Sequence, residues 1–371
     1  MDQVMGENVA LWWSNPATSV KSPSSLPGAA VMKRALIALC AVAVLAAPAA
    51  EVGAWGATGH RLIGVAAMRA LPDEVPAFLR TAQAATEVGE LAREPDRWKG
   101  GPRTHARERD TAHFIDLTED GRVLTAAGPD ITAMPELRSE YEAALTQAGL
   151  DVDDAGWLYY ALIDGWHQLV RDFAYWRVLN AAEARETDPA KRAWYAEDRR
   201  RREGLLIRDL GVWAHYVGDA AQPLHLTIHY NGWDRDTPNP EGFTTSRRTH
   251  GLFEGAYVAR VARLDQVEAA MAALGPCECP IEQRTVRYIN AGLGEVTPFY
   301  RLEKDGAFSE SDARGAEFAV TRLGAGAGEL RDLIVMAWRE SANARVGWPA
   351  VSVAEVEAGT ADAWDAMIGT D

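Results

Sequence analysis

Residues 215–225 read HYVGDAAQPLH, and this stretch carries the strongest local pattern in the chain. On a helix, residues four apart share one face, so His215 and Asp219 can point at the same ion. Pro223 should end or kink that helix, which frees His225 to turn toward a neighbouring ion. The stretch therefore predicts the end of a helix that carries metal ligands.

A second pair with the same spacing, His250 and Glu254, lies further along the chain. With 8 histidines and 53 acids among 371 residues, chance alone predicts about one such pair. An isolated pair is also more often a hydrogen bond on a helix surface than a metal site. The metal interpretation therefore depends on the pattern along the whole chain.

Apolar residues recur at helical spacing along most of the sequence, and alternating, strand-like runs are scarce. This pattern predicts an all-α fold, with a single compact multi-helix domain over residues 55–371. Gly324, Gly326 and Gly328 lack the strand and helix context of a nucleotide-binding loop and are interpreted as a flexible helix junction. Helices are expected over residues 60–71, 133–148, 156–184, 190–221, 248–274, 281–302 and 329–345.

The composition limits how the protein could bind a phosphate-containing partner. The formal net charge is -15, and such a chain has no general basic surface with which to hold a polyanion. Any phosphate site would therefore need bound cations. The three cysteines are too few for a disulfide framework, although Cys277 and Cys279 could form a bridge or contribute to a metal site.

The beginning of the chain has the pattern of an export signal. Lys33 and Arg34 precede a 16-residue apolar run over residues 35–50, and small residues end it at Ala54. The run is short for a membrane span, which needs about 20 residues. Residues 32–54 are therefore predicted to be a signal peptide, and residues 1–31 a non-native upstream extension. The mature protein would begin at Trp55 and be periplasmic or secreted.

Three shorter motifs extend the metal-ligand pattern toward the start of the chain. They are WGATGH at residues 55–60, REPDRW at residues 93–98 and AHFIDL at residues 112–117. In order, the matched residues resemble the ligands of bacterial zinc-dependent phospholipase C and of the S-one and P-one type single-strand nucleases. The matched positions are Trp55, His60, Asp96, His113, His215, Asp219, His225, His250 and Glu254.

The resemblance implies a cleft that binds three zinc ions, and imidazole and carboxylate groups do suit zinc. It assigns catalytic roles to Asp219, which would bridge two ions, and to Asp96, which would orient the attacking water. The implied ligand sets are Asp96, His113, His215 and Asp219 for one ion; His225, His250 and Glu254 for a second; and Trp55, His60 and Asp219 for the third.

Trp55 would bind zinc through its α-amino nitrogen and its carbonyl oxygen. An α-amino group has a pKa near 7.7 to 8.0 in model compounds, so it can lose its proton and bind a metal at neutral pH. In an uncleaved chain this nitrogen is an amide. Cleavage before Trp55 would therefore complete the third zinc site.

Two further residues are less clearly assigned. Asp116 follows His113 by three residues and could accept a hydrogen bond from a metal-bound imidazole, or it could be a plain surface carboxylate. His229 follows His225 by four residues and could touch metal or substrate.

The family resemblance implies hydrolysis of phosphodiester bonds through attack by a metal-bridging hydroxide. The short Trp55 to His60 gap and the long His225 to His250 gap resemble the nuclease branch, which favours single-stranded DNA or RNA as substrate. Glu254 instead matches the phospholipase C branch, where the nucleases usually have aspartate, so phospholipid is an alternative. A non-catalytic zinc-binding envelope protein is a third hypothesis. Such a protein would be expected to have lost ligands, and none of the nine is missing. No stable protein partner is predicted.

Overall fold

Helix α9 (Pro189–Asp219) is the long helix that ends in the predicted metal-binding stretch. The computed structural model describes residues 55–309 and 311–369. Asp188 caps α9, because its side chain accepts hydrogen bonds from backbone N–H groups in the first turn. After Asp219 the chain turns into the 3₁₀ helix η4 (Pro223–His225), since Pro223 has no N–H with which to extend a helix. The predicted end of the helix is therefore confirmed.

The all-α expectation is also confirmed, because the described residues are mostly helical. The α-helices are α2 (Gly56–Arg69), α3 (Ala82–Leu91), α4 (Glu94–Arg97), α5 (Arg103–Asp110), α6 (Arg138–Gln147), α7 (Val152–Ala155), α8 (Leu158–Arg185), α9, α10 (Thr249–Gly251), α11 (Val258–Val261), α12 (Leu264–Ala270), α13 (Ile281–Leu293), α14 (Val296–Lys304), α15 (Ala313–Glu340), α16 (Val353–Ala358) and α17 (Trp364–Ile368). The shorter elements are the 3₁₀ helices η1 (Ala77–Arg80), η2 (Thr111–His113), η3 (Ile131–Ala133), η4 and η6 (Ser341–Asn343), the π-helix η5 (Leu252–Tyr257) and the strands β1 (Arg345–Val346) and β2 (Val351–Ser352).

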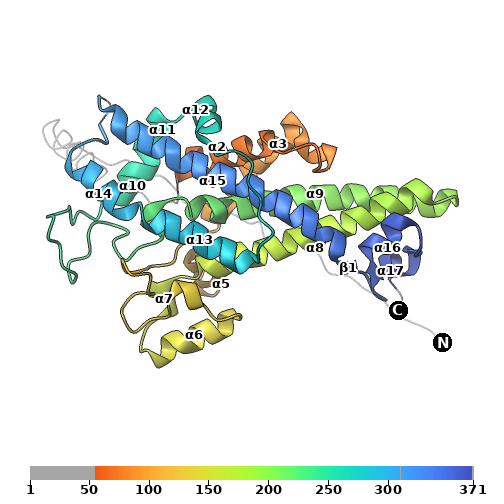
Figure 1. Ribbon diagram of the computed structural model, residues 1–371, viewed down its shortest axis with the longest axis horizontal. Helices are drawn as coiled ribbons and strands as arrows, with labels where there is room; N and C mark the ends of the chain where they lie inside the picture. Colours follow the sequence, from red (N-terminus) through yellow and green to blue (C-terminus); the bar gives the residue numbers. More distant parts are fainter. Residues whose placement is uncertain (1–54, 310, 370–371) are drawn as a thin grey trace, which may run out of the picture. The chain divides into compact units, whose positions relative to one another are not determined.

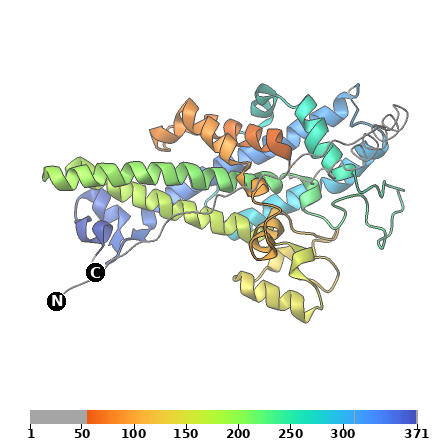
Figure 2. The same cartoon turned by 180° about the vertical axis from the view of Figure 1, so that it is seen from behind.

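Helices α8 and α9 pack side by side as a long antiparallel pair, and α15 packs against both (Figure 1). Helices α2 and α3 pack against each other and against α9, as the reverse view also shows (Figure 2). This arrangement places the start of α2 and the end of α9 against each other. The predicted ligands of both helices are thereby brought to one place.

Glycines allow the helices around α9 to approach closely. A Cβ atom on Gly165 would lie 2.0 Å from Trp213 Cδ1, and one on Gly211 would lie 2.3 Å from Leu91 Cβ. Neither distance is possible for real atoms, so any larger residue would push α8 or α3 away from α9. The indole of Trp213 also donates a hydrogen bond to the carbonyl of Leu162, which fixes the α8–α9 contact.

The predicted start of the helix over residues 329–345 is wrong, because α15 already begins at Ala313. The expected junction at Gly324, Gly326 and Gly328 lies inside this helix. A Cβ atom on Gly324 would lie 2.8 Å from Ala270 Cβ, so this glycine serves close packing against α12. The sequence pattern could not separate a packing glycine from a helix-breaking one.

Two further predicted helices are interrupted in the structure. The expected helix over residues 248–274 is divided into α10, η5, α11 and α12, with extended backbone at Ala262 and Arg263 before α12. The expected helix over residues 281–302 is divided into α13 and α14. The sequence also failed to predict α3, α5 and the β1–β2 hairpin.

The hairpin and helices α16 and α17 form a second, smaller hydrophobic cluster against α8. Its buried side chains include Val346, Val353 and Val356 from the C-terminal segment and Ala174 and Val178 from α8. The end of the α8–α9 pair away from the predicted ligands is therefore covered by the C-terminal segment.

The predicted upstream extension (residues 1–31) and signal peptide (residues 32–54) lie outside the described residues. Within the described part of the chain, every helix is too short or too polar to cross a bilayer.

Candidate metal centre

The predicted ligands come from elements spread along the chain, and they meet at the C-terminal end of α9. All of their side chains are buried except that of Asp96, which is about one-fifth exposed. In chain order they are Trp55 before α2, His60 on α2, Asp96 on α4, His113 on η2, His215 and Asp219 on α9, His225 on η4, His250 on α10 and Glu254 on η5.

The first group consists of Asp96, His113 and His215, whose ligand atoms lie within 4.8 Å of one another. His215 Nε2 and His113 Nδ1 are 2.8 Å apart. Asp219 Oδ2 lies 3.1 Å from His113 Nδ1 and 3.2 Å from His215 Nε2. The four residues that the resemblance assigns to one ion are thus neighbours.

The second group is the set of His225, His250 and Glu254, as the resemblance implies. Glu254 Oε2 lies 2.8 Å from His250 Nε2 and 3.6 Å from His225 Nε2. Glu254 lies on the π-helix η5, and π-helical turns are frequent at functional sites. Gln222, which sequence reasoning did not select, donates a hydrogen bond to Glu254 Oε2 over 3.2 Å and so fixes this carboxylate.

The third group consists of His60, His215 and Asp219. His60 Nε2 lies 3.4 Å from Asp219 Oδ1, and the His60 ring stacks on the His215 ring with centroids 3.8 Å apart. The proximity of His60 and Asp219 agrees with the sequence-based ligand set. His215 is an addition to it, so this histidine borders two of the groups.

Trp55 is held beside these groups by its side chain and by its neighbour in sequence. Its buried indole donates a 2.7 Å hydrogen bond to the carbonyl of Gly218, which directly precedes Asp219. Gly56 has a positive φ of 51°, and a Cβ atom there would lie 3.2 Å from the carbonyl oxygen of Glu254. The start of α2 is therefore wedged between α9 and η5.

The ligand groups contain buried polar atoms that form no hydrogen bond. Such an atom costs about 1 to 3 kcal/mol when it is left without a partner, so nine in one place need a common explanation. Neutral imidazole nitrogens and carboxylate oxygens are zinc ligands, so the donor set fits zinc. The nine atoms are His60 Nδ1 and Nε2, Asp96 Oδ1, His113 Nε2, Asp219 Oδ1, His225 Nε2, His250 Nδ1 and Nε2, and Glu254 Oε1.

Burial keeps the histidines in the form that binds a metal. It lowers the pKa of His60 and of His113 well below the ordinary value, with the nearby His215 adding to the effect. Burial also lowers the pKa of His215 to about 4, although Asp96 acts in the opposite direction. All three imidazoles are therefore neutral at neutral pH and offer lone pairs to a metal.

The carboxylates differ in their electrostatic surroundings. Burial raises the pKa of Asp219 well above its ordinary value, and His225 offsets this only in part. Burial acts in the same direction on Glu254, but His250 and His225 outweigh it and bring the pKa of Glu254 to about 2. Asp219, which belongs to the third group and lies beside the first, is thus the carboxylate that most needs a positive charge nearby.

Backbone carbonyls fix the orientation of two imidazoles. His215 Nδ1 hydrogen-bonds to the carbonyl of Ala92 over 2.7 Å, and His225 Nδ1 to the carbonyl of His113 over 2.7 Å. With Nδ1 acting as the donor, the Nε2 atom of each ring is left as a lone pair that faces the ligand groups. Metal-bound histidines commonly have such a partner.

Asp116 does not form the imidazole contact that its spacing suggested, since no hydrogen bond joins it to a histidine among the described residues. It is also no surface carboxylate, because it is only 4% exposed. Burial raises the pKa of Asp116 well above its ordinary value, and Asp154 adds to this. Its carboxyl group instead contributes to the wall of a cavity beside the ligand groups.

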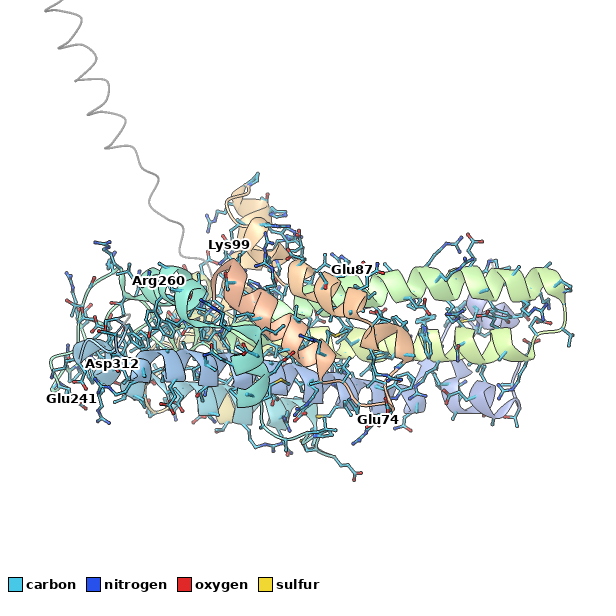
Figure 3. All side chains as sticks on the ribbon, turned by 90° about the horizontal axis from the view of Figure 1, so that it is seen from above. Glu74, Glu87, Lys99, Glu241, Arg260 and Asp312 are labelled. Carbon is cyan, nitrogen blue, oxygen red and sulfur yellow. A yellow bond between two sulfur atoms is a disulfide. The ribbon has the colours of Figure 1, made fainter. Side chains whose placement is uncertain are left out.

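This cavity has a volume of about 950 Å³ and borders His113, His225 and His250. It also borders Lys99, whose Nζ lies 2.8 Å from Asp96 Oδ1; this residue is labelled in Figure 3. Sequence reasoning missed Lys99, although its position three residues after Asp96 could have revealed it.

Most of the charged residues that line the cavity are acidic. Lys99 is the one lysine or arginine that lines the cavity in the described part of the chain. Arg107 lies nearby but is paired with Asp153, with 2.6 Å between Arg107 Nε and Asp153 Oδ1. The carboxylates that line the cavity are Asp110, Asp116, Asp151, Asp153, Asp154, Asp234 and Asp236.

His229 lies outside the three ligand groups. Its Nε2 is 3.1 Å from Glu119 Oε1, and its ring stacks on Trp233 with centroids 3.7 Å apart. Both contacts hold the loop that follows η4, so His229 has a structural role there.

Comparison of the chain with protein-family models, with curated proteins and with solved structures gives no match. What the chain does is therefore inferred from the ligand pattern and from the geometry of these groups.

Proposed function

We propose that the chain is a zinc-dependent phosphoesterase that hydrolyses phosphodiester bonds at a centre of three zinc ions. The observation that carries this proposal is the set of nine buried nitrogen and oxygen atoms without hydrogen bonds in the ligand residues, which are gathered in adjoining groups. The proposed ligands are Asp96, His113, His215 and Asp219 for one ion, His225, His250 and Glu254 for a second, and Trp55, His60 and Asp219 for the third.

Bound zinc would supply positive charge and Lewis acidity to bind and activate a phosphodiester. The neutral imidazoles would hold the ions without competing for protons. Asp96 would accept a hydrogen bond from the attacking water through its carboxylate and so orient it. Lys99 lies at hydrogen-bonding distance from that carboxylate, so its ammonium group can offset the charge there and contact a phosphate in the cavity.

Single-stranded nucleic acid is the proposed substrate, because the ligand spacings before His60 and after His225 resemble those of the nucleases. The cavity volume of about 950 Å³ leaves room for one or more nucleotides beside the ligand groups. The ions would have to offset the net charge of -15, since the protein lacks a general basic surface.

A second candidate, phospholipase C activity, is favoured by the acidic wall of the cavity. Aspartates outnumber the one lysine in this wall, even with Asp116 set aside for its raised pKa and Asp153 for its pairing with Arg107. A net acidic wall repels a polyanion but attracts the cationic end of a zwitterionic head group. Glu254 also matches this branch of the resemblance.

The test is hydrolysis by the exported, zinc-loaded protein of single-stranded DNA, RNA and phosphatidylcholine vesicles, each with and without EDTA. We expect EDTA-sensitive cleavage of the single strands. Cleavage of the vesicles alone would select phospholipase C activity instead. Bound zinc with no turnover would indicate a non-catalytic zinc-binding protein, and a protein that binds no zinc would contradict the proposal as a whole.

A further inference from the structure

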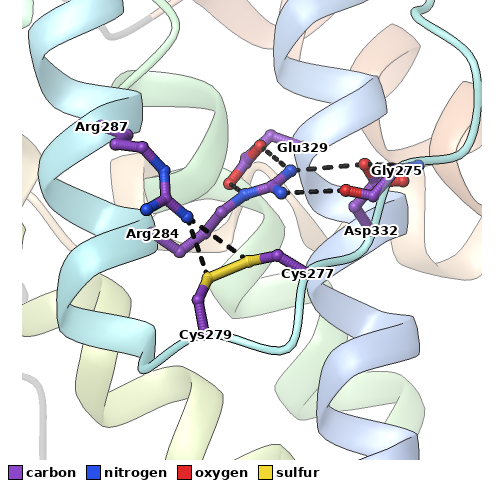
Figure 4. The surroundings of a disulfide bond; sticks show 7 residues. All are labelled: Gly275, Cys277, Cys279, Arg284, Arg287, Glu329 and Asp332. Carbon is purple, nitrogen blue, oxygen red and sulfur yellow. Dashed lines mark hydrogen bonds and ion pairs between the residues drawn. A yellow bond between two sulfur atoms is a disulfide. The ribbon is translucent and has the colours of Figure 1, made fainter.

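The segment between α12 and α13 contains a disulfide bond between Cys277 and Cys279 (Figure 4). The sequence left open whether these cysteines form a bridge or contribute to a metal site. The two cysteines are half-buried, and the ligand groups of the metal centre do not include them.

This disulfide adds little to the stability that other contacts already give the segment. The backbone N–H of Gly275 donates to Asp332, and Arg284 donates to the carbonyl of Gly275. Arg331 donates to two further carbonyls just before Gly275. The entropic effect of a disulfide grows with the length of the loop that it closes, and this one encloses a single residue.

The surroundings of the two sulfur atoms instead favour a thiolate. Arg287 Nη2 lies 2.9 Å from Cys279 Sγ and 3.4 Å from Cys277 Sγ. Cys279 also directly precedes Pro280, the N-cap residue of α13, where the helix dipole adds partial positive charge. Positive charge of both kinds lowers the pKa of a cysteine thiol.

The acidic groups nearby do not cancel the charge of Arg287. Glu329 and Asp332 on α15 are both paired with Arg284, as Figure 4 shows. Glu278, between the cysteines, and Glu282, in the first turn of α13, are exposed to solvent. In the described part of the chain no carboxylate forms an ion pair with Arg287, so its guanidinium faces the sulfur atoms.

We propose that Cys277 and Cys279 form a thiol–disulfide exchange site that accepts two electrons from a dithiol. A thiolate of the dithiol attacks Cys277 Sγ, the S–S bond breaks, and its electron pair leaves on Cys279 Sγ, which Arg287 and the start of α13 stabilise. The second thiolate of the dithiol then attacks the mixed disulfide and releases Cys277. The dithiol is oxidised to a disulfide, the protein disulfide is reduced to two thiols, and the two protons pass through water.

This site is independent of the proposed hydrolysis, so it is tested without reference to zinc or substrate. The full chain is equilibrated with mixtures of reduced and oxidised dithiothreitol and then alkylated. Mass spectrometry of the peptide with Cys277 and Cys279 gives their oxidation state separately from that of Cys40. We expect reversible reduction, with unchanged far-UV and near-UV circular dichroism. Unfolding upon reduction would show that the disulfide is structural and would overturn the proposal.

The thiolate is tested in a Cys277→Ser background, in which Cys279 reacts alone. We expect its alkylation at pH 7 to slow about five- to tenfold when Arg287→Ala is added, because the thiolate loses the positive charge that stabilises it. Arg287→Lys should restore part of the rate, and Arg200→Ala, which removes an exposed arginine on α9, should not change it. Equal rates with and without Arg287 would overturn the proposal.

Discussion

The two ends of the α8–α9 pair each contain a buried aspartate, but the two aspartates have different partners. Away from the metal centre, Asp172 on α8 is 1% exposed, and its Oδ1 atom is paired with Arg202 on α9 over 2.8 Å. At the other end of the same pair of helices, Asp219 is fully buried, and among the described residues histidines are its only ion-pair partners.

The difference separates a structural charge from a ligand. For a buried carboxylate that stabilises the fold, the chain itself supplies the counter-charge. Arg202 has this role for Asp172. A buried carboxylate surrounded by neutral imidazoles requires its counter-charge from outside the chain. The predictions that follow test this contrast, beginning with the largest expected effect.

Asp219→Asn should lower hydrolysis by about 1000-fold or more, because it removes a ligand that borders two ions. Zinc content should fall in the same variant. Asp172→Asn, the matched change at the other end of the pair, should lower the thermal unfolding midpoint but leave the zinc content unchanged. Elemental analysis and calorimetry of both variants check this. Loss of zinc from Asp172→Asn would remove the contrast between the two ends.

An additional residue before Trp55 should lower the zinc content of the mature protein from three ions toward two. The added peptide bond converts the α-amino group into an amide, which cannot bind zinc. Activity should fall about 100-fold, since one ion and one carbonyl ligand are displaced. The protein is prepared with Trp55 or with Ala-Trp55 at its amino terminus, and zinc is measured in both. Undiminished zinc in the extended form would contradict the assignment of Trp55.

In the zinc-free protein, His215 should make the free energy of unfolding depend on pH. Its folded pKa is about 4 because of burial, whereas in the unfolded chain it has the ordinary value of about 6.5. Between these values the unfolded chain binds a proton that the folded chain does not bind. The stability due to His215 is therefore intact above pH 6.5 and is lost as the pH falls toward 4.

The size of this loss is about 3 kcal/mol in the free energy of unfolding. It is measured by urea unfolding in EDTA at several pH values, for the wild type and for His215→Gln. The comparison is necessary because the raised pKa of Asp219 acts in the opposite direction. We expect the wild type to lose more stability than the variant between pH 7 and pH 4. Parallel pH profiles would contradict the neutral, buried imidazole.

Helix spacing pointed to two pairs of ligands, and the resemblance along the chain supplied the others. His215 and Asp219 are one turn apart on α9, and Pro223 ends the helix as proline usually does. The structure brings together all eight predicted histidine, aspartate and glutamate ligands around this turn. Spacing alone would not have been sufficient, because an isolated pair of this kind is common, and the other ligands followed only from the resemblance.

The sequence could not predict what depends on tertiary contacts. The carbonyls of Ala92 and His113 orient two imidazoles, and any residue could supply such a carbonyl. The π-helix at Glu254 and the close packing of Gly324 likewise depend on neighbours distant in sequence. Lys99 was missed for a different reason. It follows Asp96 by three residues, but this spacing between a lysine and an aspartate is too common to single out a functional pair.

Gln222 should have the smallest effect in this series, because it acts on a ligand through one hydrogen bond. Its amide donates to Glu254 Oε2, and its carbonyl oxygen accepts from the backbone N–H of Leu224 and so caps η4. Gln222→Ala should weaken binding of the ion at His225, His250 and Glu254 about tenfold.

The matched control is Gln83→Ala, since Gln83 donates to Glu87 on the exposed face of α3, and both changes remove one amide. The metal-free protein is titrated with zinc in the presence of a competing zinc-binding dye. This titration distinguishes a tenfold lower affinity at one site from a loss of affinity at all three sites. If Gln222→Ala lowered the zinc affinity of all three sites equally, the amide would support the fold of η4 rather than the position of Glu254. No change in either variant would show that the imidazoles alone hold this carboxylate in place.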